Sequence, residues 1–191
     1  MPGFPVTMDE IHTQILVADV FNNRKKHLIV ADRSGNVVAY NHEGTEVWET
    51  QVMGYIPEAM ALGDLDADGV LEVVVGTSEG LLYIINAQTG QFKSGYPVRL
   101  TEEAIRAPPT LVSLDTKTKE LTIVVPSTDG LVHFIHPGDC IDKIDIGSRV
   151  FSRVMADNVS NRGKMDLVLA TADGEVICLS TEAPYHPLKA S

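Results

Sequence analysis

The sequence predicts an all-β fold, because one pattern of strands and turns recurs four times along its 191 residues. The period of the repeat is about 45 residues. Each copy reads as strand, loop, strand, tight glycine turn and strand, and a fourth strand follows. The third strand is apolar on both faces, as in residues 81–85, whereas a strand of a simple sandwich would alternate. Four-stranded antiparallel sheets stacked face to face around an axis explain both features, which predicts a β-propeller.

The four predicted blades follow one another without a linker. Their approximate ranges are residues 7–48, 49–98, 99–146 and 147–185. Each has a turn glycine that follows a small or polar residue, at Gly35, Gly80, Gly130 and Gly174. Glycine suits these positions because a tight hairpin needs a positive φ. The alternative folds are a long β-sandwich and a β-solenoid.

The first residues of the chain look like the end of a blade. Residues 3–8 (Gly-Phe-Pro-Val-Thr-Met) match residues 95–100 (Gly-Tyr-Pro-Val-Arg-Leu), which close the second unit. We therefore expect residues 1–6 to be the outer strand of a preceding blade, and the chain to form about four blades of a larger ring. The end blades of such an arc would expose apolar faces, which predicts self-association or a need for further blades.

Composition narrows the classes of function. The formal net charge is −11, which argues against nucleic-acid binding, since that requires basic patches. No stretch approaches the roughly 20 apolar residues of a membrane span, so a membrane link is expected only through an anchor that this chain lacks. The N-terminus has no signal-peptide pattern. The two cysteines, Cys140 and Cys178, do not form a disulfide framework, and a bond between them is not expected.

An acidic nonapeptide, residues 64–72, predicts a calcium site. It places carboxylates at positions 1, 3, 5 and 9 and glycine at position 6, and the proposed Ca²⁺ ligands are Asp64, Asp66, Asp68, Glu72 and the carbonyl of Val70. Hard cations bind six to eight oxygens at about 2.3–2.6 Å. An EF-hand is excluded because position 12 is Val75 and because a β-branched run follows in place of a helix.

The corresponding loops of the other units lack this ligand set. In the first, which starts at Asp19, Phe21 stands at position 3 and three basic residues follow. The third, which starts at Asp115, has lysines and threonines. Counted from Asp157, the fourth has Val159 at position 3. We therefore expect one calcium site in the chain.

Two family resemblances rest on these residues. Residues 63–69 with the following Glu72 and valine run resemble an FG-GAP repeat, the calcium-bearing blade of integrin α-subunits, although the literal Phe-Gly and Gly-Ala-Pro elements are missing. Over its whole length the chain is similar to the plant family called defective in exine formation, most clearly in residues 44–49, 155–159 and 186–190. The resemblance implies the extracellular part of a single-pass plasma-membrane protein that binds calcium and helps to deposit wall or matrix material.

The leading functional hypothesis is a calcium-stabilised extracellular module for adhesion or interaction that is not an enzyme and binds a protein or a polysaccharide. The predicted contacts are the long connections between units, residues 49–58 and 99–107, at the opposite rim from the calcium loop. Residues 82–90 also resemble blades of quinone-dependent dehydrogenases, so the alternatives are a propeller enzyme of that type and an architectural spacer. The sequon at Asn158 agrees with the cell exterior or the secretory lumen.

Overall fold

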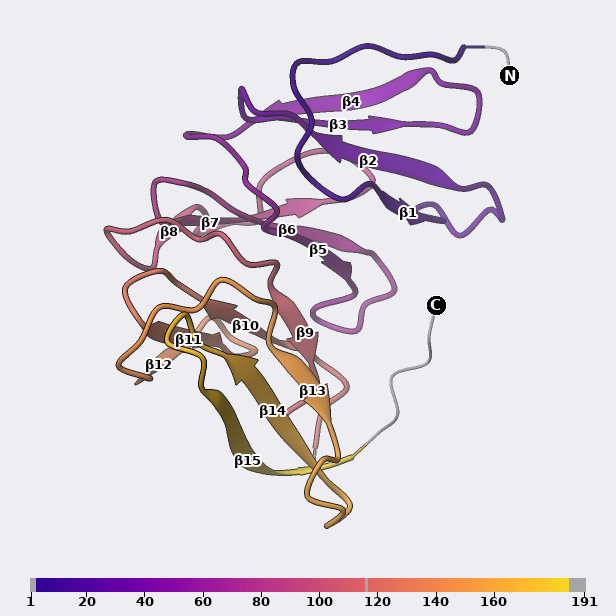
Figure 1. Ribbon diagram of the computed structural model, residues 1–191. Helices are drawn as coiled ribbons and strands as arrows, with labels where there is room; N and C mark the ends of the chain where they lie inside the picture. Colours follow the sequence, from indigo (N-terminus) through magenta and orange to yellow (C-terminus); the bar gives the residue numbers. More distant parts are fainter. Residues whose placement is uncertain (1–2, 116, 186–191) are drawn as a thin grey trace.

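The computed structural model describes residues 3–115 and 117–185, and this part of the chain is all-β. Its 15 strands form three four-stranded sheets and one three-stranded sheet, all antiparallel (Figure 1). No helix occurs there, and so none that could cross a membrane. The all-β propeller architecture predicted from the repeat is confirmed. The tail motif at residues 186–190 lies outside the described residues.

Each sheet is a run of consecutive strands, in the order in which the chain makes them. Blade 1 contains β1 (Leu16–Ala18), β2 (His27–Ala31), β3 (Asn36–Tyr40) and β4 (Glu46–Gln51). Blade 2 contains β5 (Met60–Gly63), β6 (Glu72–Gly76), β7 (Leu81–Asn86) and β8 (Val98–Arg99). Blade 3 contains β9 (Thr110–Val112), β10 (Thr122–Pro126), β11 (Leu131–Ile135) and β12 (Ile141–Asp145). Blade 4 contains β13 (Met155–Asp157), β14 (Lys164–Ala170) and β15 (Val176–Pro184).

The blades stack face to face in an open arc, with blade 1 and blade 4 at its two ends (Figure 1). Strand β7 shows why its sequence is apolar throughout. Tyr83 and Ile85 pack against blade 1 in one buried cluster, whereas Leu82 and Ile84 pack against blade 3 in another. Successive side chains of β7 therefore pack alternately against the preceding blade and the following blade, as the stacked arrangement requires. This packing excludes the simple β-sandwich, in which one face of each sheet meets solvent.

The loops fall at two opposite ends of the sheets. The connections β1–β2, β5–β6 and β13–β14 lie at one end, and the hairpins that follow β2, β6 and β14 lie at the other together with the connections between blades (Figure 1). The predicted separation of the acidic loop from the inter-blade connections is therefore confirmed. Residues 3–8 form no strand, but Val6 and Met8 pack against Val30 and Val38 on the face of blade 1 that points away from blade 2.

The hairpin glycines hold the blades to the connections beside them. Gly80 has a φ of 71°, and its carbonyl accepts a hydrogen bond from the amide of Leu100. A Cβ atom there would lie 2.0 Å from the carbonyl oxygen of Thr101. The equivalent Gly174 of blade 4 has a φ of 89° and open space around the same position.

This difference predicts unequal effects of one substitution. Gly174→Ala should cost about 1 kcal/mol, because an L-residue with positive φ is strained. Gly80→Ala should cost about 1–2 kcal/mol more, because the Thr101 backbone must also move. Urea unfolding of the two variants and the parent chain measures both values. Equal losses would show that the close approach at Gly80 is not a constraint.

Candidate functional site

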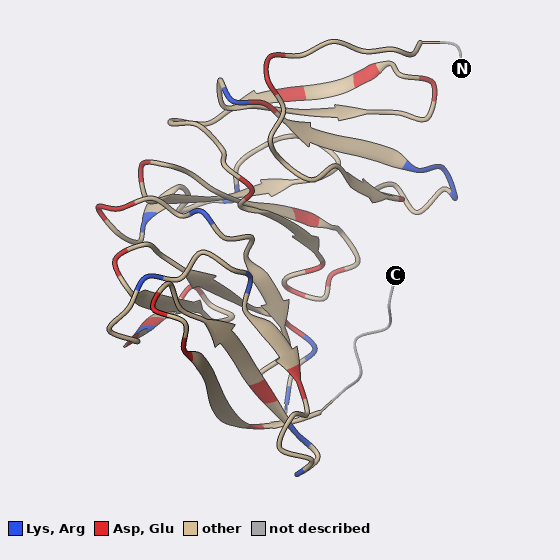
Figure 2. Ribbon diagram, in the orientation of Figure 1, with Lys and Arg blue, Asp and Glu red and all other residues tan. Residues whose placement is uncertain are grey.

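The acidic loop between β5 and β6 folds around the side chain of Asp64. The two carboxylate oxygens of Asp64 accept hydrogen bonds from the amides of Asp68 (3.1 Å) and Gly69 (3.0 Å). The backbone reverses at Ala67 and Gly69, where φ is 60° and 89°. Glycine at the second of these positions avoids the strain that a side chain would bring. The Asp64 carboxylate therefore holds the loop together, and no helix flanks it (Figure 2).

Three of the predicted ligands come together in this loop. Asp64, Asp66 and Glu72 each place a carboxylate oxygen within 4.8 Å of the others. Oxygens bound to one Ca²⁺ at about 2.3–2.6 Å can be separated by up to roughly 5 Å, so the spacing suits that ion. Glu72, the first residue of β6, closes the inner side of the cluster and is 8% exposed, whereas Asp66 faces solvent.

The remaining predicted ligands are not part of this cluster. Asp68 accepts a hydrogen bond from the amide of Val70 at 2.7 Å, which fixes the last turn of the loop. The Asp68 carboxylate and the Val70 carbonyl therefore stay predictions as ligands. Glu72 uses one oxygen to accept a hydrogen bond from the amide of Leu65 at 2.9 Å.

The electrostatics of the cluster disfavour the charged form of Glu72. Burial raises the pKa of Glu72 to about 7, and the neighbouring Asp66, Asp68 and Asp64 carboxylates act in the same direction against the Leu65 hydrogen bond. No ion pair joins the cluster within residues 3–115 and 117–185. A bound cation would remove both the repulsion and the desolvation cost.

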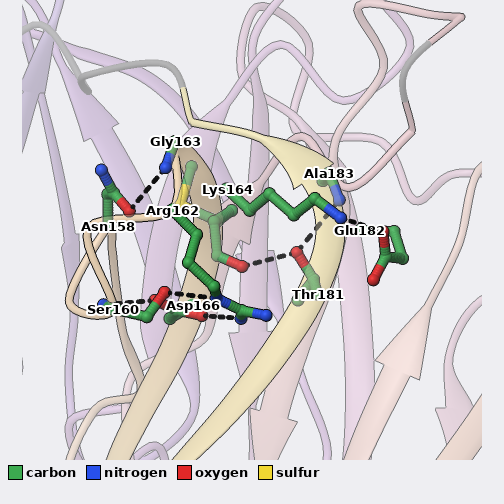
Figure 3. A network of polar contacts seen from close by, with 10 residues as sticks. Asn158, Ser160, Arg162, Gly163, Lys164, Asp166, Thr181, Glu182 and Ala183 are labelled. Atoms are coloured by element: carbon green, nitrogen blue, oxygen red, sulfur yellow. Dashed lines mark hydrogen bonds and ion pairs between the residues drawn. The ribbon is translucent and has the colours of Figure 1, made fainter.

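Blade 4 repeats the same backbone loop and corrects one prediction. Asn161 and Gly163 have φ values of 54° and 71°, matching Ala67 and Gly69, and the amide of Gly163 donates to Asn158 Oδ1 at 3.1 Å (Figure 3). Position 1 of this loop is therefore Asn158. The count from Asp157 was wrong by one residue, since Asp157 is the last residue of β13, and position 3 is Ser160.

In this loop a guanidinium group lies where blade 2 has only acids. Arg162, at position 5, contacts Asp166 Oδ1 at 3.2 Å and donates from Nε to Ser160 Oγ at 2.9 Å (Figure 3). Asp166 is buried at the register position of Glu72, opposite the last residue of the first strand. Hydrogen bonds from Ser160, with further help from Ser180 and Arg162, lower the pKa of Asp166 to about 2.

The loop of blade 1 has the same backbone fold but places a third set of side chains at its centre. Asp19 accepts hydrogen bonds from the amides of Asn23 (3.0 Å) and Arg24 (2.5 Å). Phe21 at position 3 and His27 at position 9 pack edge to face, with ring centroids 4.9 Å apart. One backbone loop therefore holds an aromatic pair, an acidic cluster or an internal ion pair, according to its sequence.

A second feature lies at the opposite rim, between blades 3 and 4. An open hollow of about 590 Å³ is lined mainly by Glu103, Asp129, Ser148, Arg149, Phe151 and Asp173. Two of its acids are held in place, because Thr101 donates to Asp129 and Ser148 donates to Asp173, both at 2.5 Å. Glu103 belongs to the predicted contact range 99–107, but the rest come from hairpins and from residues 147–151, which no sequence pattern had indicated.

Solved structures with similar folds are propeller-like chains of low sequence identity. The crystal structure of the computationally designed Ika4 protein has a TM-score of 0.67 and 15% identity, and the match covers 92% of this chain and 94% of that chain. BBS1N in complex with ARL6DN, soaked with lead, gives a TM-score of 0.64 at 13% identity, with 97% and 57% covered. BamB from Moraxella catarrhalis gives 0.53 at 13% identity, with 92% and 60% covered. They support the fold alone.

Two curated relatives correct a functional prediction. Lambda-carrageenase of Pseudoalteromonas carrageenovora is 23% identical over 142 residues, 74% of this chain and 14% of that protein. Lambda-carrageenase of Pseudoalteromonas sp is 28% identical over 60 residues, 31% of this chain and 6% of that protein. Both relatives are enzymes by name, so the prediction that the chain is not an enzyme is contradicted. The chain spans only a small fraction of their length.

A family model accounts for the central part of the chain. The model of the lambda-carrageenase β-propeller domain matches residues 27–153, which is more than half of the sequence and includes the acidic loop. The predicted β-propeller class is therefore correct, whereas the resemblances to FG-GAP repeats and to the exine-formation family stay predictions. The chain belongs to the lambda-carrageenase β-propeller domain family.

Proposed function

We propose that the chain is a calcium-stabilised β-propeller module of an extracellular protein that binds or processes polysaccharide. The observation behind the calcium part is the cluster of Asp64, Asp66 and Glu72, in which Glu72 is buried without a basic partner among the described residues. The same loop in blade 4 has Arg162 beside its buried acid. The comparison within one chain supports the proposal that the blade 2 loop takes up a cation from solution.

Calcium fits this cluster better than other common ions. The ligand atoms are all oxygens, which disfavours zinc, since zinc sites usually contain nitrogen or sulfur. Magnesium requires nearly ideal octahedral geometry, whereas calcium accepts irregular coordination by carboxylates and carbonyls. In this role calcium is structural, because it fixes a surface loop between two strands and lies far along the sheet from the rim hollow.

Calcium titration tests this part. With few protein ligands, we expect a dissociation constant of about 10⁻⁴–10⁻³ M, as in extracellular modules. Chelation should lower the melting temperature, because calcium stabilises only the native state that binds it. Asp66→Ala should remove both the calorimetric signal and the effect of the chelator, whereas Asp142→Ala, an exposed acid on β12, should retain them. Identical melting curves with calcium and with chelator would contradict the site, and a sub-micromolar constant would contradict the extracellular assignment.

The polysaccharide part rests on the names of the relatives and on the rim hollow. The exposed ring of Phe151 offers a flat apolar surface, and Arg149, Asp173 and Glu103 surround it with hydrogen-bonding groups. A few polar groups around an aromatic surface are typical of small-molecule and sugar subsites. Adhesion and a role in wall deposition remain predictions of the earlier resemblance.

Retardation in gels that contain polysaccharide tests this part separately. We expect at least one polysaccharide of a panel that includes lambda-carrageenan and neutral chains to slow the protein, and Phe151→Ala to weaken the apparent affinity about 10-fold, because an aromatic contact contributes on the order of 1 kcal/mol or more. Phe92→Ala removes a similarly exposed aromatic on a different part of the surface and serves as the control. If neither lambda-carrageenan nor any other polysaccharide slows the parent chain, the polysaccharide part is wrong and a protein partner is favoured.

A further inference from the structure

The two end blades leave complementary apolar faces without a neighbouring sheet. Every sheet has one face toward the preceding blade and one toward the following blade, here called its N-ward and C-ward faces. Within the described residues, the N-ward face of blade 1 and the C-ward face of blade 4 have no sheet packed against them (Figure 1). Their exposed side chains can be compared with residues at the same register in the inner blades.

The C-ward face of blade 4 is built like an internal interface. Val176 is the second residue after the hairpin glycine and is 74% exposed. The residues at the same position in the other blades are all 0% exposed: Val37, Leu82 and Val132. On the same face Met155 is 61% exposed and Cys178 is exposed, whereas Ala61, which has the register of Met155, is 5% exposed.

The N-ward face of blade 1 shows the same contrast. In the hairpin of blade 1, the amide of Arg33 donates a hydrogen bond to the carbonyl of Glu10. The next residue, Ile11, is 46% exposed. The residues at the same position before the other blades are at most 1% exposed: Ile56, Ile105 and Val150. Ile15 is 48% exposed, whereas its register equivalents Met60 and Val154 are 3% and 0% exposed.

These two faces are the two halves of one type of contact. At each of the three internal interfaces, the C-ward face of one blade is covered by the N-ward face of the next. The C-ward face of blade 4 therefore has the pattern of side chains that packs on N-ward faces inside the arc, and on blade 1 the part of the N-ward face that is left open lies beside Val30 and Val38, which Val6 and Met8 cover. The two faces cannot meet within one chain, because they lie at opposite ends of the arc (Figure 1).

We propose that a second copy of this chain covers both faces, with blade 4 of each copy packed on blade 1 of the other. Such head-to-tail contacts close into a ring when the rotation allows it. Two copies give a ring of eight sheets, and propellers typically have four to eight blades. The match covers 57% of BBS1N and 60% of BamB, so the four sheets span a little more than half of each of these longer chains.

Sedimentation equilibrium under reducing conditions gives the first test. The parent chain is expected to sediment at twice its mass of 20.7 kDa. Val176→Asp and Ile15→Lys should each weaken association at least about 100-fold, because each places a charge in an apolar contact. Val159→Asp changes another exposed valine, 56% exposed in the β13–β14 loop, and should leave the dimer intact.

Mixing the two variants tests the head-to-tail geometry. A mixed dimer has one unaltered interface and one in which the introduced aspartate of one copy meets the introduced lysine of the other, so association should recover. Pairing of blade 4 with blade 4 would instead leave Ile15→Lys without effect, and a mixture would not recover. Circular dichroism of each separate variant distinguishes loss of association from loss of folding.

The cysteines provide an independent readout on the unaltered chain. Cys178 lies on the proposed interface and Cys140 on blade 3 away from it, and both are exposed in the single chain. In the dimer, Cys140 should react with a thiol reagent and Cys178 should be protected. A parent chain that sediments as a monomer with equal reactivity at both cysteines would overturn the proposal, and would assign the end faces to blades of a longer chain. Open oligomers larger than a dimer would also overturn it.

Discussion

Glu72→Gln is expected to stabilise the calcium-free protein by about 3 kcal/mol at pH 8 and to abolish its response to calcium. Burial, reinforced by the nearby aspartates, raises the pKa of Glu72 from 4.5 to about 7, so the ionised form is held at a cost in the folded chain. Glutamine keeps the shape and can still accept the hydrogen bond from Leu65. It also removes one of the three clustered carboxylates.

The pH dependence follows from the direction of this shift. Because the folded-state pKa of Glu72 lies above the unfolded value, the native state binds this proton more tightly. The calcium-free protein should therefore lose stability as the pH rises from about 4.5 to about 7, and should change little above that range. Glu72→Gln should remove this slope, and thermal unfolding between pH 4.5 and 8 with a chelator measures it.

Asp166→Asn provides a matched control, because its expected effect on stability has the opposite sign. Asp166 occupies the same register in blade 4, but its hydrogen bonds from Ser160 and its contact with Arg162 lower its pKa to about 2. Neutralising it leaves the guanidinium without its acid, so the variant should be less stable at pH 8. If both amide substitutions destabilised the chain equally, the acidic loop would not be a site of unrelieved charge.

Much of the fold could be predicted from sequence because its constraints are local and repeated. The hairpin glycines and the apolar run at residues 81–85 indicated turns and a strand buried on both faces, and the structure shows why. The same holds for Asp64, Asp66 and Glu72, which the loop brings together because positions 1, 3 and 9 face its centre. The relation to a carrageenase was not predictable from this pattern, since repeats and turns specify a fold and do not specify a chemistry.

Other features depend on where a strand ends and on contacts between distant segments. In blade 4 the acid Asp157 looked like position 1, but Asn158 performs that role with its amide oxygen, so acidity was a misleading marker. The pairing of Arg162 with Asp166 was missed for the same reason. The rim hollow combines Glu103, Arg149 and Asp173 from three separate segments, and no local pattern indicates that they meet.

Val132→Asp and Val176→Asp should have very different effects on folding, although the two valines occupy the same position in neighbouring blades. Val132 is 0% exposed between blades 3 and 4, among Val112, Phe134 and Leu167. A carboxylate there has no partner, and its desolvation should destabilise the chain by more than about 4 kcal/mol and abolish cooperative unfolding. Val176 is 74% exposed, so its substitution should leave the β-sheet signal and a cooperative transition.

Circular dichroism and urea unfolding of the two variants, at a concentration low enough to keep the chain monomeric, measure this difference. The two variants compare one repeated position in two environments. Inside the arc the valine packs between two blades, and at the end of the arc it is exposed to solvent. If Val176→Asp unfolded the isolated chain as fully as Val132→Asp, the end face would belong to the core of a single arc. If instead only Val132 is essential for folding, Val176 is a surface residue of the single arc and is available for contact with another blade.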